Sequence, residues 1–349
     1  MKSSFVSSAA IQNAMRLTMR QTQNQIVKTS LEATTGTYAD IGESLGNGVS
    51  KVVDFNRELD RIKAITDSNS VAGGRLSTIQ DGLSDLQKTG TDFASNLTAL
   101  QGSQNSTSIK VAIQSANNTL NTLLTTGNGM YNGEYIFGGI NSDTQPLTDQ
   151  SSTVASNIST ALTTYAGSLG VAVQDMTGDQ MTDFITTQVE PMFSEANWTD
   201  PTNGWSKASD QPMTSRISNS EVVATSTSAN SDGMRYVALS AVMTSALLST
   251  GNLSADAMNA VSKKAIAYAA QGTSGLVSQS SQLGLSQERV EKANDSLNAQ
   301  STLIQTKLTD LTGVDQTQAS TMLKSLQTQL ETSYTIVSKI QQLSLVNYL

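Results

Sequence analysis

The sequence contains neither cysteine nor histidine. These two absences exclude disulfides, thiol nucleophiles, zinc sites built from Cys and His, and every catalytic triad that uses imidazole as its base. Proline is scarce as well, with 4 residues among 349, and aromatic residues make up only 5% of the chain. A catalytic site would therefore have to depend on carboxylates, hydroxyls, lysine or tyrosine.

Charge is also sparse. Charged residues make up 14% of the chain, and the excess of acidic residues gives a formal net charge of -8. Because nonspecific binding to nucleic acid requires clusters of Lys and Arg, we expect no nucleic-acid partner. No apolar run approaches the roughly 18 residues of a membrane helix, so membrane insertion is not expected. The polar, weakly charged remainder suits close packing of many copies.

A heptad pattern organises the N-terminal half of the chain. From Ile65 to Leu100, apolar or small residues recur at alternating steps of four and three, which keeps one stripe of a long helix facing a neighbouring helix. Asn69 and Gly90 interrupt the stripe. The pattern predicts one helix from about Lys51 to Leu100. We call the apolar members of the stripe the first seam: Ile65, Ala72, Leu76, Ile79, Leu83, Leu86, Phe93 and Leu97.

A second seam lies near the other end of the chain, at strict spacings of seven. Each large residue of such a stripe contributes roughly 1.5–3 kcal/mol when it leaves water, so both seams require partners. We expect the two to pack together, which would fold the N- and C-terminal parts back on one another. The second seam consists of Leu283, Val290, Leu297, Ile304 and Leu311.

The helices around the second seam are marked by capping residues and glycines. A helix is predicted from Ser254 to Gln271, and Gly272 and Gly275 are expected to separate it from the seam helix at 277–311. Helical spacing also resumes near Asp232 and is expected to break at Gly251 and Asn252, and a shorter helix is predicted from Ser108 to Leu124.

The middle of the chain differs in composition, because all four prolines and both tryptophans fall between residues 146 and 212. Ahead of this region, a brief strand is predicted at Tyr135–Phe137 between glycine-containing turns. Within it, alternating residues predict short strands at Gly170–Val173 and Glu221–Ala224, and a helix is predicted near Met181–Val189. We interpret this region as an inserted α+β domain. The predicted fold class is mainly α, with long antiparallel N- and C-terminal helices in a coiled-coil-like bundle.

These patterns predict three structural parts. Residues 1–45 and 312–349 would form terminal helices that pair on assembly. Residues 46–140 and 235–311 would form a helical core, and residues 141–234 the inserted outer domain.

The two ends of the chain carry signals of their own. No acidic residue precedes Glu32, and such an amphipathic leader fits a mitochondrial presequence, an uncleaved export signal or a plain packing helix. The C-terminal segment is rich in large apolar residues, which would be exposed by fraying unless something covers them. They are Leu330, Tyr334, Val337, Ile340, Leu343, Leu345, Val346, Tyr348 and Leu349.

Three carboxylate pairs at helical spacing are the remaining candidates for chemistry: Asp54 with Glu58, Asp81 with Asp85, and Asp175 with Asp179. A pair on one helix face could act in acid–base catalysis or bind a metal. Solvated helix faces carry such pairs routinely, and too few further oxygen ligands are near in the sequence. We therefore predict no enzymatic activity, no catalytic residue, no metal and no cofactor.

Residues at both ends resemble the flagellin superfamily. The resemblance covers most of residues 1–140 and 235–349. On the N-terminal side it includes Ser30–Gly36, Asn69, Ala72, Arg75 and Gln80–Leu83, and on the C-terminal side Leu311–Asp315, Leu330–Tyr334 and Leu343–Leu349. The Gly133–Gly139 stretch is similar to a Gly-x-Tyr-x-Phe-Gly-Gly segment of the members that join the flagellar hook to the filament.

The resemblance implies an extracellular structural protein of the bacterial flagellum that self-associates in a ring or tube through its terminal helices. It implies export through the flagellar type III apparatus, a cytoplasmic export chaperone on the C-terminal segment, and hook-side junction protein and flagellin as neighbours. Two alternatives stay open, namely a flagellin that forms the filament itself and a coiled-coil surface protein that is secreted.

Overall fold

The computed structural model describes residues 8–346. The chain divides into two compact units, one made of the residues up to Ala64 together with those from Leu297 onward, and one made of Ile65–Ser296. Long helices dominate both units, and the only strands among the described residues form two small sheets. The predicted mainly α fold with an inserted β-containing region is confirmed. The three-part division of the chain stays a prediction.

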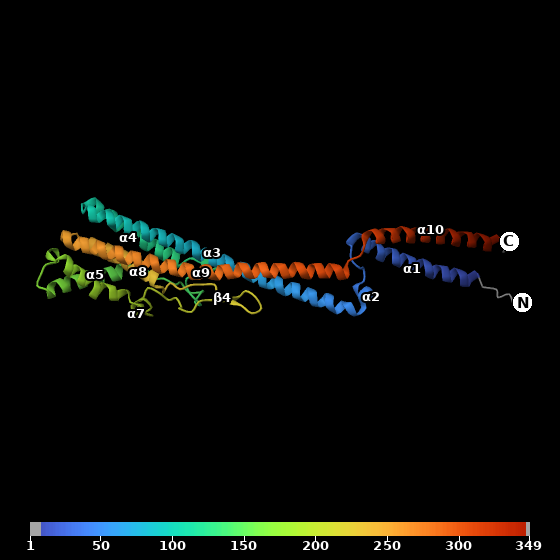
Figure 1. The fold of residues 1–349 in the computed structure, drawn as a ribbon, viewed down its shortest axis with the longest axis horizontal. Helices are drawn as coiled ribbons and strands as arrows, with labels where there is room; N and C mark the ends of the chain where they lie inside the picture. The colour runs from blue at the N-terminus through green and yellow to red at the C-terminus, as the bar shows by residue number, and fades with distance from the viewer. Residues whose placement is uncertain (1–7, 347–349) are drawn as a thin grey trace. The chain divides into compact units, whose positions relative to one another are not determined.

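In the first unit, α1 (Ser8–Thr35) and α10 (Gln316–Val346) lie side by side in antiparallel orientation (Figure 1). The Gln23 amide donates a 2.9 Å hydrogen bond to the Tyr334 hydroxyl. At the other end of the pair, Thr37 and Gly313 form an isolated antiparallel bridge. A short helix α2 (Ile41–Leu45) and the 3-10 turn Gly46–Gly48 follow α1, where the glycine spacing had predicted only a flexible break.

The second unit is built around helix α8 (Asp232–Leu248), which is buried along most of its surface. It packs against α4 (Ser106–Gly127), whose first turn is capped by the Asn105 side chain. The long helix α3 (Val49–Gly102) contributes the first seam to the same core. The predicted helices at 51–100 and 108–124, and the one from Asp232 to the break at Gly251, are therefore confirmed, each to within three residues at either end.

The predicted break at Gly272 and Gly275 is wrong, because α9 (Ala255–Thr312) runs through both positions without interruption. These glycines instead permit close packing of α9 on α8. A Cβ atom at Gly275 would lie 2.7 Å from the backbone of Gly233, and one at Gly272 would lie 2.7 Å from Val237 Cγ2. Glycines often mark the end of a helix, but Gly272 and Gly275 lie inside α9, where the backbone of α8 approaches them closely.

Replacing Gly275 with alanine is expected to destabilise the protein by about 1–3 kcal/mol, since overpacking against the Gly233 backbone outweighs the higher helix propensity of alanine. Gly284→Ala, in the same helix, is the matched control, because its Cβ would meet nothing closer than the Gln80 amide at 3.7 Å. The control should be neutral or stabilising by up to about 1 kcal/mol. Urea unfolding of both variants measures the difference, and equal midpoints would contradict the packing argument.

The insert contains more helix than the sequence suggested. Helix α5 (Ser151–Ser168) was missed, because its Ser-, Thr- and Ala-rich sequence carries only a narrow apolar stripe. The predicted strand at Gly170–Val173 is wrong, since this segment is a turn that leads into the 3-10 helix Val173–Asp175. The predicted helix near 181–189 is confirmed as α6 (Gly178–Phe184), continued by the π-helix Ile185–Val189.

Two antiparallel hairpins complete the second unit. In the first, β1 (Met130–Tyr131) pairs with β2 (Glu134–Tyr135), and the predicted strand at Tyr135–Phe137 is confirmed only at its first residue. In the second, β3 (Thr214–Arg216) pairs with β4 (Val222–Ala224), as expected at residues 221–224. The remaining short elements are the 3-10 helix Glu190–Phe193 and α7 (Glu195–Trp198).

The two tryptophans form the centre of the insert. Trp198 and Trp205 are almost fully buried, and their rings stack with centroids 5.5 Å apart. The Trp198 indole donates a 3.1 Å hydrogen bond to the Ala229 carbonyl, just ahead of α8. The insert is thereby joined to the helical part of the same unit through a shared core.

Candidate functional site

The first seam lies in the core of the second unit. Ala72, Leu76, Ile79, Leu83, Leu86, Phe93 and Leu97 are all buried, and Ile65, where the unit begins, is half-buried. The two interruptions are buried as well, because Asn69 is fully enclosed and Gly90 faces Thr273 of α9. The seam therefore packs within the chain itself, and any role of these residues in assembly stays a prediction.

The second seam is buried along part of its length. Leu283 and Val290 are buried in the second unit, and Leu297 is buried in the first. Ile304 and Leu311, also in the first unit, are half-buried. In the second seam, the residues that keep the most accessible surface are therefore Ile304 and Leu311, near the end of α9.

The α1–α10 pair presents large apolar side chains to solvent. Leu17, Val27 and Leu31 of α1 are 61%, 69% and 49% exposed, and on α10 Met322 and Tyr334 are 49% and 50% exposed. Leu330, Val337 and Ile340, predicted to take part in polymerisation, are half-buried. The side chains of Leu343, Leu345, Val346, Tyr348 and Leu349 lie outside the described residues, as do residues 1–7 of the leader. These exposed apolar side chains are the candidate surface for contact with another protein.

The Gly133–Gly139 segment connects the insert to the helices, and its glycines have identifiable roles. Asn132 and Gly133, both with positive φ, form the two-residue turn of the first hairpin. A Cβ at Gly138 would lie 2.5 Å from the Asn141 carbonyl oxygen, and one at Gly139, which has φ +62°, would lie 2.2 Å from the Ser209 carbonyl oxygen. A side chain at Gly139 would therefore displace the Ser209 backbone of the insert, and one at Gly138 would displace the nearby Asn141 carbonyl.

Backbone hydrogen bonds join this segment to three residues of the insert. The Ser209 amide donates to the Gly138 carbonyl at 3.0 Å, the Gly139 amide to the Thr227 carbonyl at 3.1 Å, and the Ala229 amide to the Phe137 carbonyl at 2.8 Å. The side chain of Phe137 itself is fully buried. We call residues 133–139 the clasp, because they hold the returning chain of the insert against the helical core.

The clasp is also bound to α3 through Arg75, one of the residues that carry the family resemblance. The Arg75 guanidinium is buried, forms an ion pair with Glu134, and lies 2.8 Å from the Met213 sulfur just before β3. Arg75 thus joins α3 to both hairpins of the second unit. The first hairpin has a signal in the sequence, the Asn132-Gly133 pair between two short β-prone runs, although only a strand was predicted there.

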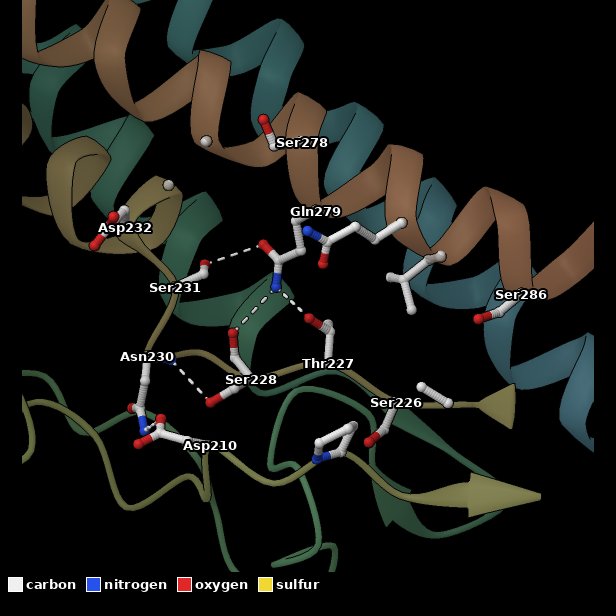
Figure 2. Close-up of a pocket in the computed structure, with 16 residues that line it drawn as sticks. Asp210, Ser226, Thr227, Ser228, Asn230, Ser231, Asp232, Ser278, Gln279 and Ser286 are labelled. Carbon is white, nitrogen blue, oxygen red and sulfur yellow. Dashed lines mark hydrogen bonds between the residues drawn. The ribbon is translucent and has the colours of Figure 1, made fainter. Parts of the chain in front are cut away.

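A groove of the second unit is lined largely by polar side chains, several of which hydrogen-bond to one another (Figure 2). Its volume is about 590 Å³, and it lies between α9, the start of α8 and the loop that follows β4. Gln279 of α9 donates to the Thr227 hydroxyl and to the Ser228 carbonyl, and it accepts from the Ser231 hydroxyl. Such a network rigidifies the contact between the insert and the helices.

The candidate carboxylate pairs lie on the surface. Asp81, Asp85, Asp175 and Asp179 are exposed, and Glu58 is half-buried in an ion pair with Arg61. That arginine lowers the pKa of the Glu58 carboxyl by a charged hydrogen bond. Across residues 8–346, no group of three or more acidic residues has the geometry to hold a metal ion. No helix in this range is long and apolar enough to cross a membrane.

One buried tyrosine gives the second unit a pH dependence. Tyr268 of α9 stacks on Tyr236 and donates a 2.6 Å hydrogen bond to Glu190. Burial, and then the hydrogen bond to the Glu190 carboxylate, raise the pKa of the Tyr268 hydroxyl well above its usual value. A raised folded-state pKa means that the tyrosine stabilises the protein fully below about pH 10 and progressively less as the pH rises further.

Tyr268→Phe is therefore expected to cost about 1 kcal/mol at pH 7, through loss of the hydrogen bond. Above about pH 10 the difference should shrink, because the Tyr268 hydroxyl then ionises in the unfolded chain, which lowers the stability of the wild type, whereas the variant has no hydroxyl to ionise. Urea midpoints at pH 7, 9, 10 and 11 measure this effect. A difference that stays constant across the series would contradict it.

Two comparisons bear on the identity of the chain. Residues 6–142 match the bacterial flagellin N-terminal helical region, and residues 266–349 match the bacterial flagellin C-terminal helical region. The matched regions are the long helices and the clasp, and they leave α5 to α8 outside. The chain belongs to the flagellin superfamily, whose members are structural proteins of the extracellular bacterial flagellum. A search among curated proteins gave no match.

Membership explains the features that lacked a chemical role. The flagellin domains imply that the chain polymerises into filament-like assemblies, for which long helices with exposed apolar side chains are suited. The α1–α10 pair, all of α3 and most of α9 belong to the two matched regions. We therefore take the α1–α10 surface as the candidate site of self-association.

Proposed function

We propose that this chain is a hook–filament junction protein of the kind called hook-associated protein 3. It would connect the hook-side junction protein to the first flagellin subunits and accommodate the mechanical mismatch between a bending hook and a stiffer filament. The observation that carries the proposal is the Gly133–Gly139 segment, which is similar to the Gly-x-Tyr-x-Phe-Gly-Gly stretch of junction proteins. Its contacts support a rigid joint between insert and helices.

The terminal helices supply the means of assembly in this proposal. Leu17 and Val27 on α1 and Tyr334 on α10 leave apolar surface that the α1–α10 pair does not cover. Neighbouring copies in a ring or tube would bury it, each large side chain contributing roughly 1.5–3 kcal/mol. Before assembly, a cytoplasmic export chaperone would shield the C-terminal segment, and the acid-free leader would serve as an uncleaved signal for type III export.

A flagellin of the filament itself is the second candidate, because the two matched regions are common to the whole superfamily. Deletion of the chromosomal copy separates the two functions. If the chain is a junction protein, the deletion strain should form hooks without filaments, and flagellin should accumulate in the medium. If the chain is instead a filament flagellin, the deletion strain should lack the filament and should also lack the corresponding subunit in the medium. Filaments of normal length and number in the deletion strain would contradict the junction proposal.

A further inference from the structure

The two interruptions of the first seam lie at contacts between α3 and α9 that are specific to one register of these helices. Asn69 donates a 2.8 Å hydrogen bond from its amide nitrogen to the Asn294 side-chain oxygen of α9. Gly90 faces Thr273, whose methyl carbon lies 2.8 Å from the position that a Cβ at Gly90 would occupy. Both contacts lie within the second unit.

Two more polar bridges connect the same helices. The Gln80 side chain donates to the Ser280 carbonyl at 2.7 Å and accepts from the Ser280 hydroxyl. Gln104, just after α3, donates to the Asn259 side chain at 2.7 Å. The partners on α9 move from 294 to 280 to 259 as the position on α3 rises, so the helices are antiparallel. We call the three bridges the amide rungs.

The apolar seams alone do not distinguish one register from the next. Ala72, Ile79, Leu86 and Phe93 repeat every seven residues, as do Leu283, Val290 and Leu297. A slip by one heptad, about 10 Å along the helix axis, would therefore again place apolar residues opposite apolar residues. Such a slip changes what each rung meets. With a slip of one heptad along α9, Ile266 would oppose Gln104, which would lose its partner. The same slip would place Ser301 opposite Asn69, a shorter side chain with a hydroxyl in place of the Asn294 amide oxygen, and Gln287 opposite Gln80.

The burial of Asn69 makes it the most selective member of the set. Its side chain is fully buried and uses both amide hydrogens, one on Asn294 and one on the Ile217 carbonyl beside β3 at 3.0 Å. Its oxygen has no hydrogen-bond partner among the described residues. An apolar residue would remove that unpaired oxygen, so the asparagine is not explained by stability alone, and a buried polar residue at a seam position is known to specify register.

We propose that Asn69 with Asn294, supported by Gly90 and the other amide rungs, sets the register of α3 against α9. The register determines which residues of α3 and α9 lie at the same level along the helix axis. In an assembly, it therefore determines which residues form the surface that contacts the neighbouring copy. The proposal concerns the fold of the single chain and is independent of the hook–filament assignment.

The absence of cysteine makes a direct test possible, because spin labels can be placed on engineered cysteines alone. Labels at the exposed positions Thr91 on α3 and Val277 on α9 report the axial offset of the two helices through their distance distribution. The test variant is Asn69→Leu with Asn294→Leu, which makes both seams apolar. The control is Gln114→Leu on α4, an exposed amide whose side chain donates only to Asn118 one turn away.

Wild type and the control should give one distance. The double variant should keep its far-UV circular dichroism and gain a second population, with the labels displaced along the axis by about one heptad, or about 10 Å. A single, unchanged distance in the double variant would overturn the proposal. If the double variant fails to fold, Asn294→Ala is measured in its place, and the same second population is expected. Unfolding of both variants would also overturn it, since the pair would then be required for folding and would not select among registers.

Discussion

Replacing Leu326 with aspartate is expected to abolish incorporation of the chain into flagella while leaving the second unit folded. Leu326 is one of the few buried apolar residues on α10, at 7% exposure, and α10 packs on α1. A carboxylate at this position would lose most of its hydration without a partner, which costs several kcal/mol and should separate the pair. Quantitative immunoblotting of sheared flagella against the culture supernatant measures incorporation.

Thr328→Asp is the matched control, because it places the same charge on an exposed position of α10. It should leave the α1–α10 pair intact by circular dichroism. Both tryptophans lie in the insert, so unchanged tryptophan fluorescence would show that the second unit is folded in either variant. Incorporation of Leu326→Asp at the wild-type level would show that the α1–α10 pair is not required for assembly.

Phe93→Ala is expected to lower the free energy of unfolding of the second unit by about 3–5 kcal/mol, through lost apolar burial and the cavity that remains. Phe93 is 1% exposed and is among the largest fully buried side chains of the chain. Urea unfolding followed by far-UV circular dichroism and by tryptophan fluorescence measures the loss. Both signals should shift together, because Phe93 and the two tryptophans belong to one continuous core.

Lys88→Ala on the same helix serves as the control. Lys88 is exposed and pairs only with Asp92 one turn away, so the change should fall within about 0.5 kcal/mol. If the fluorescence transition of Phe93→Ala stayed at the wild-type midpoint while the circular dichroism transition moved, the insert would be a separate folding unit. That result would contradict the shared core.

The long helices could be predicted because their periodicity extends over many turns. Seven positions of the first seam, from Ala72 to Leu97, are buried, as an apolar stripe at this spacing requires. The error at Gly272 and Gly275 has a definite cause. Local sequence shows a helix-breaking residue, and only the approach of Gly233 from α8 shows why glycine is needed there.

The insert was less predictable because its structure depends on contacts distant in sequence. Helix α5 has few large apolar residues, and it is held by packing on α8 rather than by a strong pattern of its own. The clasp could be recognised as a motif from Gly133 and the Gly138–Gly139 pair. Its role as a joint required the Ser209 and Thr227 backbones, which lie about 70 to 90 residues further along the chain.

The central claim, that the chain forms the junction between hook and filament, is tested most directly by immunogold electron microscopy of intact flagella with antibody against the insert. The expected result is label confined to one narrow band beside the hook. Label along the whole filament would contradict the claim and make the chain a filament flagellin. Absence of label from flagella, with the antibody validated on the purified protein, would contradict it as well and favour a secreted surface protein.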